Sequence, residues 1–91
     1  MNESFQLNCT ASTNMYDDIS WLKDGHSFKP DTQNIKLKNY YVDNLKNSMV
    51  SFARLEVNNS GNYTCVGHIR RGGTSRTTSV LLVKGNFFKL I

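Results

Sequence analysis

Residues of the types that perform catalysis occur in this 91-residue chain, but none are spaced to supply a nucleophile, a base and an orienting group in one pocket. Asp24, His26 and Ser27 come closest, because a carboxylate, a base and a hydroxyl lie close together in the chain. They follow an Asp-Gly turn, however, and side chains in such a turn are solvated rather than gathered in a pocket. The segment Arg71–Gly73 is too short for a phosphate-binding loop, and no helical pattern follows it. We therefore predict no catalytic residue, no cofactor and no enzyme activity.

The cysteines, Cys9 and Cys65, point to a structural role instead. With His26 and His68 they show none of the close paired spacings of zinc modules, so we expect no metal site. A bridge between the two cysteines would close a long loop and stabilise the fold by roughly 4 kcal/mol, a large share for a small domain. Such a bridge favours an oxidising compartment, and two buried free thiols in a cytosolic protein are the alternative.

Several asparagines fit the N-x-Ser/Thr pattern of glycan attachment. They are Asn2, Asn8, Asn58 and Asn62, and the second has Cys9 between the asparagine and the threonine. We expect one or two of these sites to carry a glycan, Asn62 and Asn58 before Asn2, and Asn8 last. This pattern favours a glycoprotein that is secreted or displayed at the cell surface.

Size and composition allow one folded domain. The chain is 38% hydrophobic and 20% charged, which is typical of a globular domain and would be unusual for a disordered tail. The longest apolar run, Val80–Val83, is far shorter than the roughly 20 residues that cross a bilayer. No charged and apolar leader follows Met1, so we expect any signal peptide or membrane anchor of a parent protein to lie outside this chain.

Apolar residues alternate with polar ones along most of the chain, which is typical of half-buried β-strands. The inward-facing residues are Phe5, Leu7, Cys9, Ile19, Trp21, Ile35, Leu37, Val50, Phe52, Tyr63, Cys65, Ser79, Leu81 and Val83. Asp24-Gly25 and Arg70–Gly73 read as turns, and Asn39–Asn47 reads as a loose polar connection. Short strands without a helical period predict an all-β, antiparallel sandwich of two sheets.

Three segments resemble the immunoglobulin superfamily, in particular its intermediate-type set. They are Leu7–Cys9, Trp21–Gly25 and Val50–Cys65, and the similarity extends from Glu3 to Val83. The resemblance implies an inter-sheet disulfide with Trp21 packed on it, and it makes Tyr63, two residues before the second cysteine, the tyrosine of a corner motif. It also places Leu55 and Gly61 in the signature of the fold.

Two departures from the family pattern matter. Asn59 stands where the family usually has aspartate, so the corner must rely on neutral hydrogen bonds. The first strand of the family is missing ahead of Cys9, and the tail Phe87–Ile91 is a candidate for part of it or for a link to a following domain. We therefore expect one immunoglobulin-like domain over residues 1–84 and a tail or linker over residues 85–91.

The favoured functional hypothesis is protein recognition by an extracellular receptor or adhesion module. The net charge is +4, and arginines gather around the last hairpin, which favours acidic partners. The partner, a protein ligand or a like domain, would contact this hairpin and a sheet face with outward-pointing apolar residues. The hairpin residues are Arg70, Arg71 and Arg76, and the face residues are Leu22, Val66, Val80 and Leu82.

Two alternatives stay open. In the first, the arginines form a basic strip with Lys23, Lys36 and Lys38 and bind heparin or heparan sulfate, as in some growth-factor or matrix proteins. In the second, the chain is an intracellular structural domain of a muscle filament, with reduced cysteines. No feature indicates nucleic-acid binding, and although this chain does not span a membrane, its parent protein is free to do so.

Overall fold

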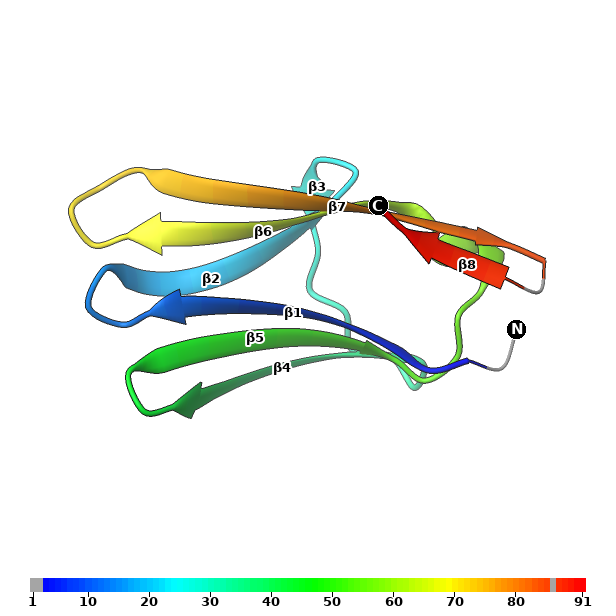
Figure 1. The fold of residues 1–91 in the computed structure, drawn as a ribbon, viewed down its shortest axis with the longest axis horizontal. Coiled ribbons are helices and arrows are strands. Elements are labelled where there is room, and N and C mark those ends of the chain that lie inside the picture. The colour runs from blue at the N-terminus through cyan, green and yellow to red at the C-terminus, as the bar shows by residue number, and fades with distance from the viewer. Residues whose placement is uncertain (1–2, 86) are drawn as a thin grey trace.

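The computed structural model describes residues 3–85 and 87–91. In it the chain folds into two antiparallel sheets (Figure 1). The first sheet has the order β1-β5-β4, and the second has the order β3-β2-β6-β7-β8. The elements are β1 (Phe5–Ser12), β2 (Tyr16–Lys23), β3 (His26–Ser27), β4 (Ile35–Val42), β5 (Leu45–Phe52), the short 3-10 helix η1 (Val57–Asn59), β6 (Gly61–Ile69), β7 (Thr74–Lys84) and β8 (Phe87–Leu90). The predicted all-β sandwich is confirmed.

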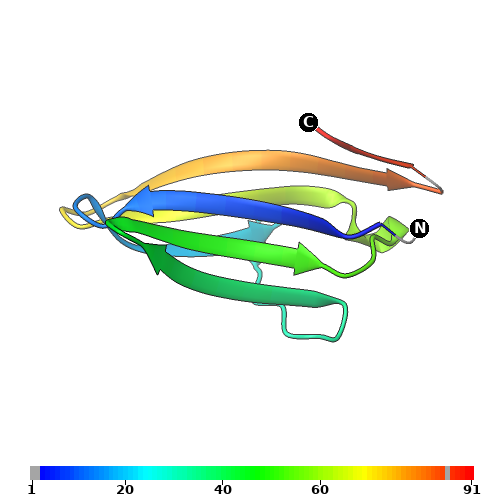
Figure 2. The same ribbon diagram turned by 60° about the horizontal axis from the view of Figure 1, so that its bottom comes forward.

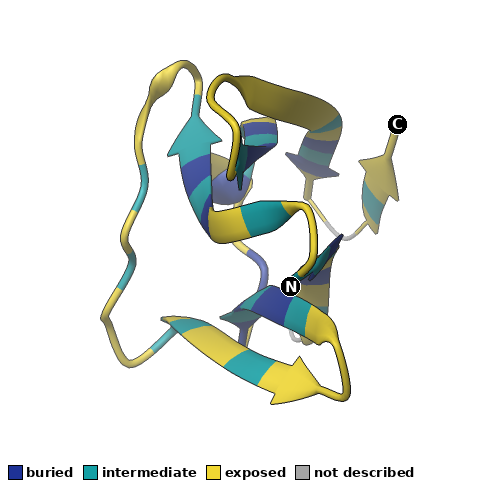
Figure 3. Cartoon of the chain, turned by 90° about the vertical axis from the view of Figure 1, so that its left-hand side faces the viewer, coloured by how far each residue is buried: buried dark blue, intermediate teal, exposed yellow. Residues whose placement is uncertain are grey.

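The core lies between the sheets and is built from alternate residues of each strand, as the banding of buried and exposed positions in Figure 3 shows. A disulfide joins Cys9 of β1 to Cys65 of β6 and so crosses from one sheet to the other, which confirms the predicted bridge. Trp21 lies opposite Cys65 in the β2–β6 ladder, and its indole Nε1 donates a hydrogen bond of 2.8 Å to Oγ of the fully buried Ser48.

The segment Asn39–Asn47, expected to be a loose polar connection, is instead the part of a β-hairpin around its turn. Strand β4 continues to Val42, and β5 begins at Leu45 after a tight turn in which Asp43 has a φ of 54°. Aspartate is one of the few residues that tolerates this left-handed conformation. The prediction was wrong because this end of the β4–β5 pair buries little apolar surface: Tyr41 and Val42 are exposed, so no alternation of buried apolar residues marks the strand.

The last strand occupies part of one edge of the five-stranded sheet. β8 pairs antiparallel with β7, and the backbone groups of Ile91 and Val80 exchange two hydrogen bonds beyond the end of the strand. Its inward-facing Phe88 packs edge-on against Phe5 of β1, with ring centroids 5.2 Å apart. The tail therefore contributes to the packing between the sheets rather than trailing away from it.

Candidate functional site

The β1–β2 loop and the β6–β7 hairpin meet at one end of the sandwich, and we call Thr13–Met15 together with Arg70–Gly73 the tip (Figure 1). Backbone bonds define the hairpin: Ile69 N–H donates to Gly73 O at 3.0 Å, and Gly72 N–H donates to Ile69 O at 2.9 Å. Gly72 and Gly73 have φ values of 110° and 86°, a conformation that glycine adopts without strain.

Arg70 fastens the hairpin to the neighbouring loop. Its backbone N–H donates to Met15 O at 2.9 Å, and its side-chain Nε donates to Thr13 O at 3.0 Å. Its Nη1 lies 2.7 Å from Oδ1 of Asp17. Arg70 was predicted to contact a partner, but the structure uses its backbone N–H and two of its guanidinium nitrogens to hold the tip together. A rigid tip loses little conformational entropy when it binds.

The tip carries a shallow apolar depression with a positive charge at its rim. The depression has a volume of about 680 Å³, and its lining includes Met15 and Ile69 beside Arg71. Met15 is 56% exposed. Arg71 is exposed and forms no ion pair within residues 3–85 and 87–91. Sequence reasoning missed Met15 and Ile69, although a methionine inside the polar stretch Ser12–Asp18 was the available signal.

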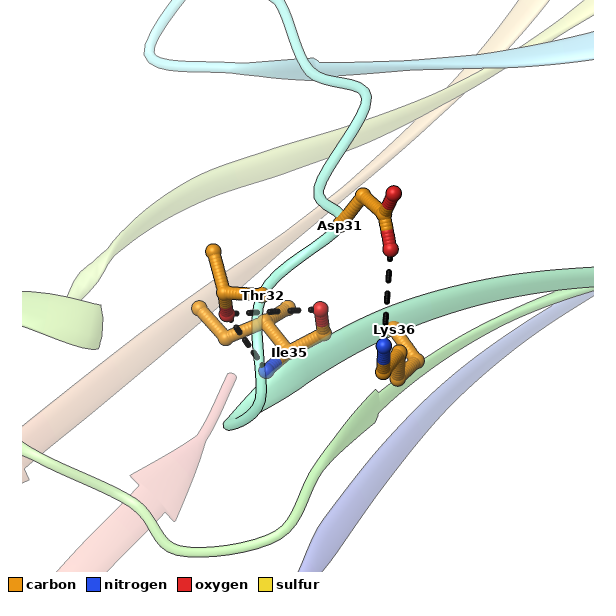
Figure 4. Close-up of polar contacts among 4 residues, drawn as sticks. All are labelled: Asp31, Thr32, Ile35 and Lys36. Atoms are coloured by element: carbon orange, nitrogen blue, oxygen red, sulfur yellow. Dashed lines mark hydrogen bonds and ion pairs between the residues drawn. The ribbon is translucent and has the colours of Figure 1, made fainter.

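The structure does not assemble the basic strip that heparin binding would use. Arg76 lies on the five-stranded sheet, whereas Lys36 and Lys38 lie on β4 of the other sheet. Lys36 pairs with Asp31 at 3.4 Å beside a turn in which Ile35 N–H donates to Thr32 Oγ1, as Figure 4 shows. Lys38 lies over the ring of Tyr40.

The third lysine of the expected strip, Lys23, belongs to the five-stranded sheet but lies at the end of β2 away from the tip. Its Nζ donates a hydrogen bond of 3.0 Å to Asn58 O. The lysines and the hairpin arginines therefore face different directions, and no continuous row joins them.

The expected apolar face of the five-stranded sheet is only partly exposed. Leu22 and Leu82 are half-buried, and Val80 is 38% exposed. Val66 does face away from the core cluster, but it is only 4% exposed, so its expected role in contact is wrong. The reason is that β6 is flanked on both sides, so side chains of the neighbouring strands cover the methyl groups of Val66.

The tail adds apolar surface that was not part of the predicted face. Ile91 bonds to Val80 in the ladder and is 68% exposed, and Phe87 of β8 is 53% exposed. The pairing of β8 with β7 places both residues at the edge of the five-stranded sheet.

At the end opposite the tip, a tyrosine corner holds η1 to β6. The hydroxyl of Tyr63 donates a hydrogen bond of 2.5 Å to Asn59 O, and the side-chain Oδ1 of Asn59 accepts one of 2.7 Å from Glu56 N. Asn59 thus supports the corner with neutral hydrogen bonds where the family usually has a carboxylate. Burial, followed by the charge of Asp24, raises the pKa of Tyr63 to about 12.

Two further signature residues lie close to this corner. Leu55 is fully buried, and its backbone N–H donates to Glu3 O. Gly61 begins β6, and a Cβ at this position would lie 3.0 Å from Oδ2 of Asp24. The small size of glycine therefore lets the Asp24 carboxylate accept a hydrogen bond of 2.9 Å from Asn62 N.

The Asp24 carboxylate is therefore part of the strand connection, while the neighbouring His26 and Ser27 are exposed on the short strand β3. Within the described ranges, no three His, Cys, Asp or Glu side chains gather as a metal site would require. No helix in this part of the chain is long and apolar enough to cross a membrane.

An ion pair connects the two sheets. Lys46 of β5 donates to Asp18 of β2 at 2.5 Å. This hydrogen bond is the main reason that the pKa of Asp18 lies below its ordinary value and that the pKa of Lys46 lies above its own. Nearby, Ser20 Oγ lies 2.9 Å from His68 Nε2 on the outer face of the sheet.

The predicted glycan sites that the structure describes lie on the surface of the domain. Asn8, Asn58 and Asn62 are exposed, and Asn2 lies outside the described residues. The hydroxyl of Ser60, which belongs to the Asn58 site, donates to Val83 O and accepts from Val83 N. That hydroxyl is therefore already engaged. Glycan attachment stays a prediction at each site.

The chain was compared with models of known protein families. The model described as "Immunoglobulin domain" matches residues 2–78. Among curated proteins, none matches the chain at a significant level. The narrower assignment to the intermediate-type set stays a prediction.

Proposed function

Because the chain belongs to the immunoglobulin domain family, we propose that it is an extracellular recognition or adhesion module of a larger cell-surface or secreted protein. Domains of this family are typically non-enzymatic and generally mediate protein interactions, and a disulfide within the fold is typical of extracellular members. The partner is a protein with an acidic and apolar surface, and the main contact is the tip.

The shape of the tip is the observation that carries this proposal. An apolar depression beside the exposed guanidinium of Arg71 offers the residue types, methionine and arginine, that are enriched in protein interfaces. Arg70 holds both loops of the tip in place, so binding needs little ordering of the chain. Arg71 and the net charge of +4 favour an acidic partner surface and accelerate its encounter with the tip.

The apolar face around Val80 is the weaker candidate for this contact, because it competes with a glycan. Asn62 lies directly opposite Val80 in the β6–β7 ladder, so a glycan on Asn62 would cover that face. The tip lies at the other end of β6, about 23 Å from Asn62 along an extended strand. A glycan on Asn62 would leave the tip accessible.

The proposal is tested with the domain displayed as a multivalent fusion on fluorescent beads, which are applied to a panel of animal cell lines. The variants Met15→Ala and Arg71→Glu alter the tip. Arg54→Glu is the matched control, because it makes the same charge change in an exposed residue just after β5, whose last residue pairs with the start of β1, away from the tip. We expect Arg71→Glu to reduce bead binding about tenfold or more and Arg54→Glu to leave it nearly unchanged.

Equal melting temperatures of the variants would exclude unfolding as the cause. If Arg54→Glu abolished binding while both tip variants kept it, the contact surface would lie elsewhere. The extracellular context has its own test in protein secreted from eukaryotic cells. We expect no free thiol and a shift in mobility after glycosidase treatment, whereas reduced cysteines and no shift would indicate an intracellular domain.

A further inference from the structure

The turn between β4 and β5, Val42–Leu45, lies at the same end of the sandwich as the tip, as Figure 2 shows. Thr13 joins the two. Its backbone N–H and its hydroxyl both donate to Asn44 O, at 2.9 and 3.1 Å, and its own carbonyl accepts a hydrogen bond of 3.0 Å from Arg70 Nε. These bonds hold the β4–β5 turn, the β1–β2 loop and the β6–β7 hairpin at a fixed spacing, so the three form one surface.

The β4–β5 turn presents an acidic residue between apolar ones. Asp43 is exposed, and so are Val42 and Leu45 on either side of the turn. Asp43 forms no ion pair with any residue that the structure describes. An exposed carboxylate beside apolar side chains is the kind of surface proposed above for the partner of the tip. The chain therefore carries such a surface itself, next to the tip that would bind it.

The charges at this end of the sandwich balance, although the whole chain has a net charge of +4. Two ion pairs neutralise themselves there, Arg70 with Asp17 and Lys46 with Asp18. Arg71 in the tip and Asp43 in the β4–β5 turn have opposite charges and no ion pair within the described ranges. A second copy that approaches end to end therefore meets a neutral surface with one unpaired charge of each sign.

The shape of this end also fits a second copy. The β6–β7 hairpin extends further than the β4–β5 turn in both Figure 1 and Figure 2, so the end of the sandwich is oblique. A two-fold axis perpendicular to the long axis of the sandwich places the hairpin of each copy over the β4–β5 turn of the other. The same axis brings Arg71 of each copy towards Asp43 of the other, because the two residues lie on either side of Thr13.

We infer that the tip and the β4–β5 turn form one self-complementary interface, and that the partner is a second copy of this chain. The inference rests on the proposed function, because it names the partner of the same tip. In the dimer, the β4–β5 turn of each copy enters the apolar depression of the other. Asp43 then pairs with Arg71, and Val42 and Leu45 pack towards Met15. Each contact occurs twice, because the two-fold axis repeats it.

The size of the end determines how strongly two copies bind. The extents of the sandwich perpendicular to its long axis are 24 and 20 Å, so the end buries about 500 Å² per copy at most, less than the roughly 800 Å² of a standard stable interface. The hydrogen bonds of Thr13 and Arg70 limit the ordering that binding requires. We therefore expect a weak dimer with a Kd on the order of 0.1–1 mM, which multivalent display strengthens.

The test is a charge exchange, measured by sedimentation equilibrium of the purified chain at concentrations up to about 2 mM. Arg71→Glu and Asp43→Lys each place like charges together at both ends of the interface, so each alone is expected to lower the association constant about tenfold or more. In an equimolar mixture of the two variants, every changed residue meets an opposite charge. We expect this mixture to associate within about threefold of the wild type.

Matched variants test the apolar contact and the turn. Val42→Ala is expected to lower the association constant about threefold or more, whereas Val57→Ala changes an equally exposed valine at the opposite end, in η1, and should leave it unchanged. Asp43 has a φ of 54°, which lysine tolerates less well than aspartate. If Asp43→Lys fails to fold, Asp43→Asn decides, because asparagine keeps the turn and removes the charge. It should weaken association about threefold.

A wild-type chain that stays monomeric up to about 2 mM would overturn the inference, as would a dimer whose association the mixture of variants fails to recover. The two proposals fail in different ways. Cell binding that depends on Arg71 while the chain stays monomeric leaves the proposed function in place and assigns the tip to another protein. Cell binding that Arg54→Glu abolishes and the tip variants keep overturns the proposed function instead.

Discussion

Replacing Tyr63 by phenylalanine tests how the tyrosine corner stabilises the fold. The side chain is 1% exposed, and its hydroxyl donates to the backbone oxygen of Asn59, which is itself buried. Phenylalanine keeps the ring and leaves that oxygen without its donor. A neutral hydrogen bond contributes about 1 kcal/mol, and an unsatisfied buried acceptor costs about 1–3 kcal/mol. We expect Tyr63→Phe to lower the free energy of unfolding by about 2 kcal/mol at neutral pH.

The pH dependence of this difference is the sharper test. The folded domain raises the pKa of Tyr63 to about 12, whereas the ordinary value is 10.0. Between these values the folded state holds a proton that the unfolded state has lost, so stability falls as pH rises. At about pH 11 the loss amounts to about 1.4 kcal/mol. The variant lacks this group, so the stability difference between the two proteins should shrink by that amount.

Urea unfolding at about pH 8 and about pH 11, followed by tryptophan fluorescence, measures both values. The comparison of wild type with variant cancels contributions that they share, including that of Lys46, whose pKa is also raised. An unchanged difference at the two pH values would refute the reasoning, because it would mean that Tyr63 titrates alike in the folded and unfolded states.

Three other changes test the core and the connection between the sheets. Replacing Cys9 and Cys65 by alanine should lower the free energy of unfolding by about 4 kcal/mol, measured by urea unfolding against the oxidised protein. Ser48→Ala leaves the buried indole N–H of Trp21 without its acceptor, so we expect a loss of about 1–3 kcal/mol, with the exposed Ser27→Ala as a neutral control. Asp18→Asn should cost only about 0.5 kcal/mol at neutral pH, because the Asp18 side chain is 60% exposed. The pKa of Asp18 is lowered on folding, so its contribution is present above the ordinary value of 3.8 and is lost as pH falls below it. The unfolding midpoints of wild type and Asp18→Asn should therefore converge at about pH 2, and a constant gap down to that pH would contradict the ion pair with Lys46.

The strand pattern was readable from the sequence wherever alternation brings apolar residues to one face. Leu7, Ile19, Trp21 and Val50 were assigned inward, and all are buried. The segment from Asn39 to Asn47 was misread because β4 is an edge strand with little apolar surface. Alternation reports burial on one face, so it weakens wherever a strand buries little.

The sequence predicted the candidate binding site less well than it predicted the strands. Arg70 and Arg71 were assigned the same role, yet Arg70 ties the tip together whereas Arg71 is exposed and forms no ion pair with any described residue. That difference depends on Thr13 and Asp17, which lie far from the hairpin in the chain. Met15 became a candidate only when folding brought the two loops together.

By itself the sequence determined the two-sheet fold, the single disulfide and the positions of most core residues, because these follow from local alternation and from having one possible cysteine pair. Only the tertiary structure decided which charges are neutralised, that Val66 is covered, and that β8 pairs with the edge of β7. Those outcomes depend on contacts between residues distant in the chain, and such contacts leave no periodic pattern in the sequence.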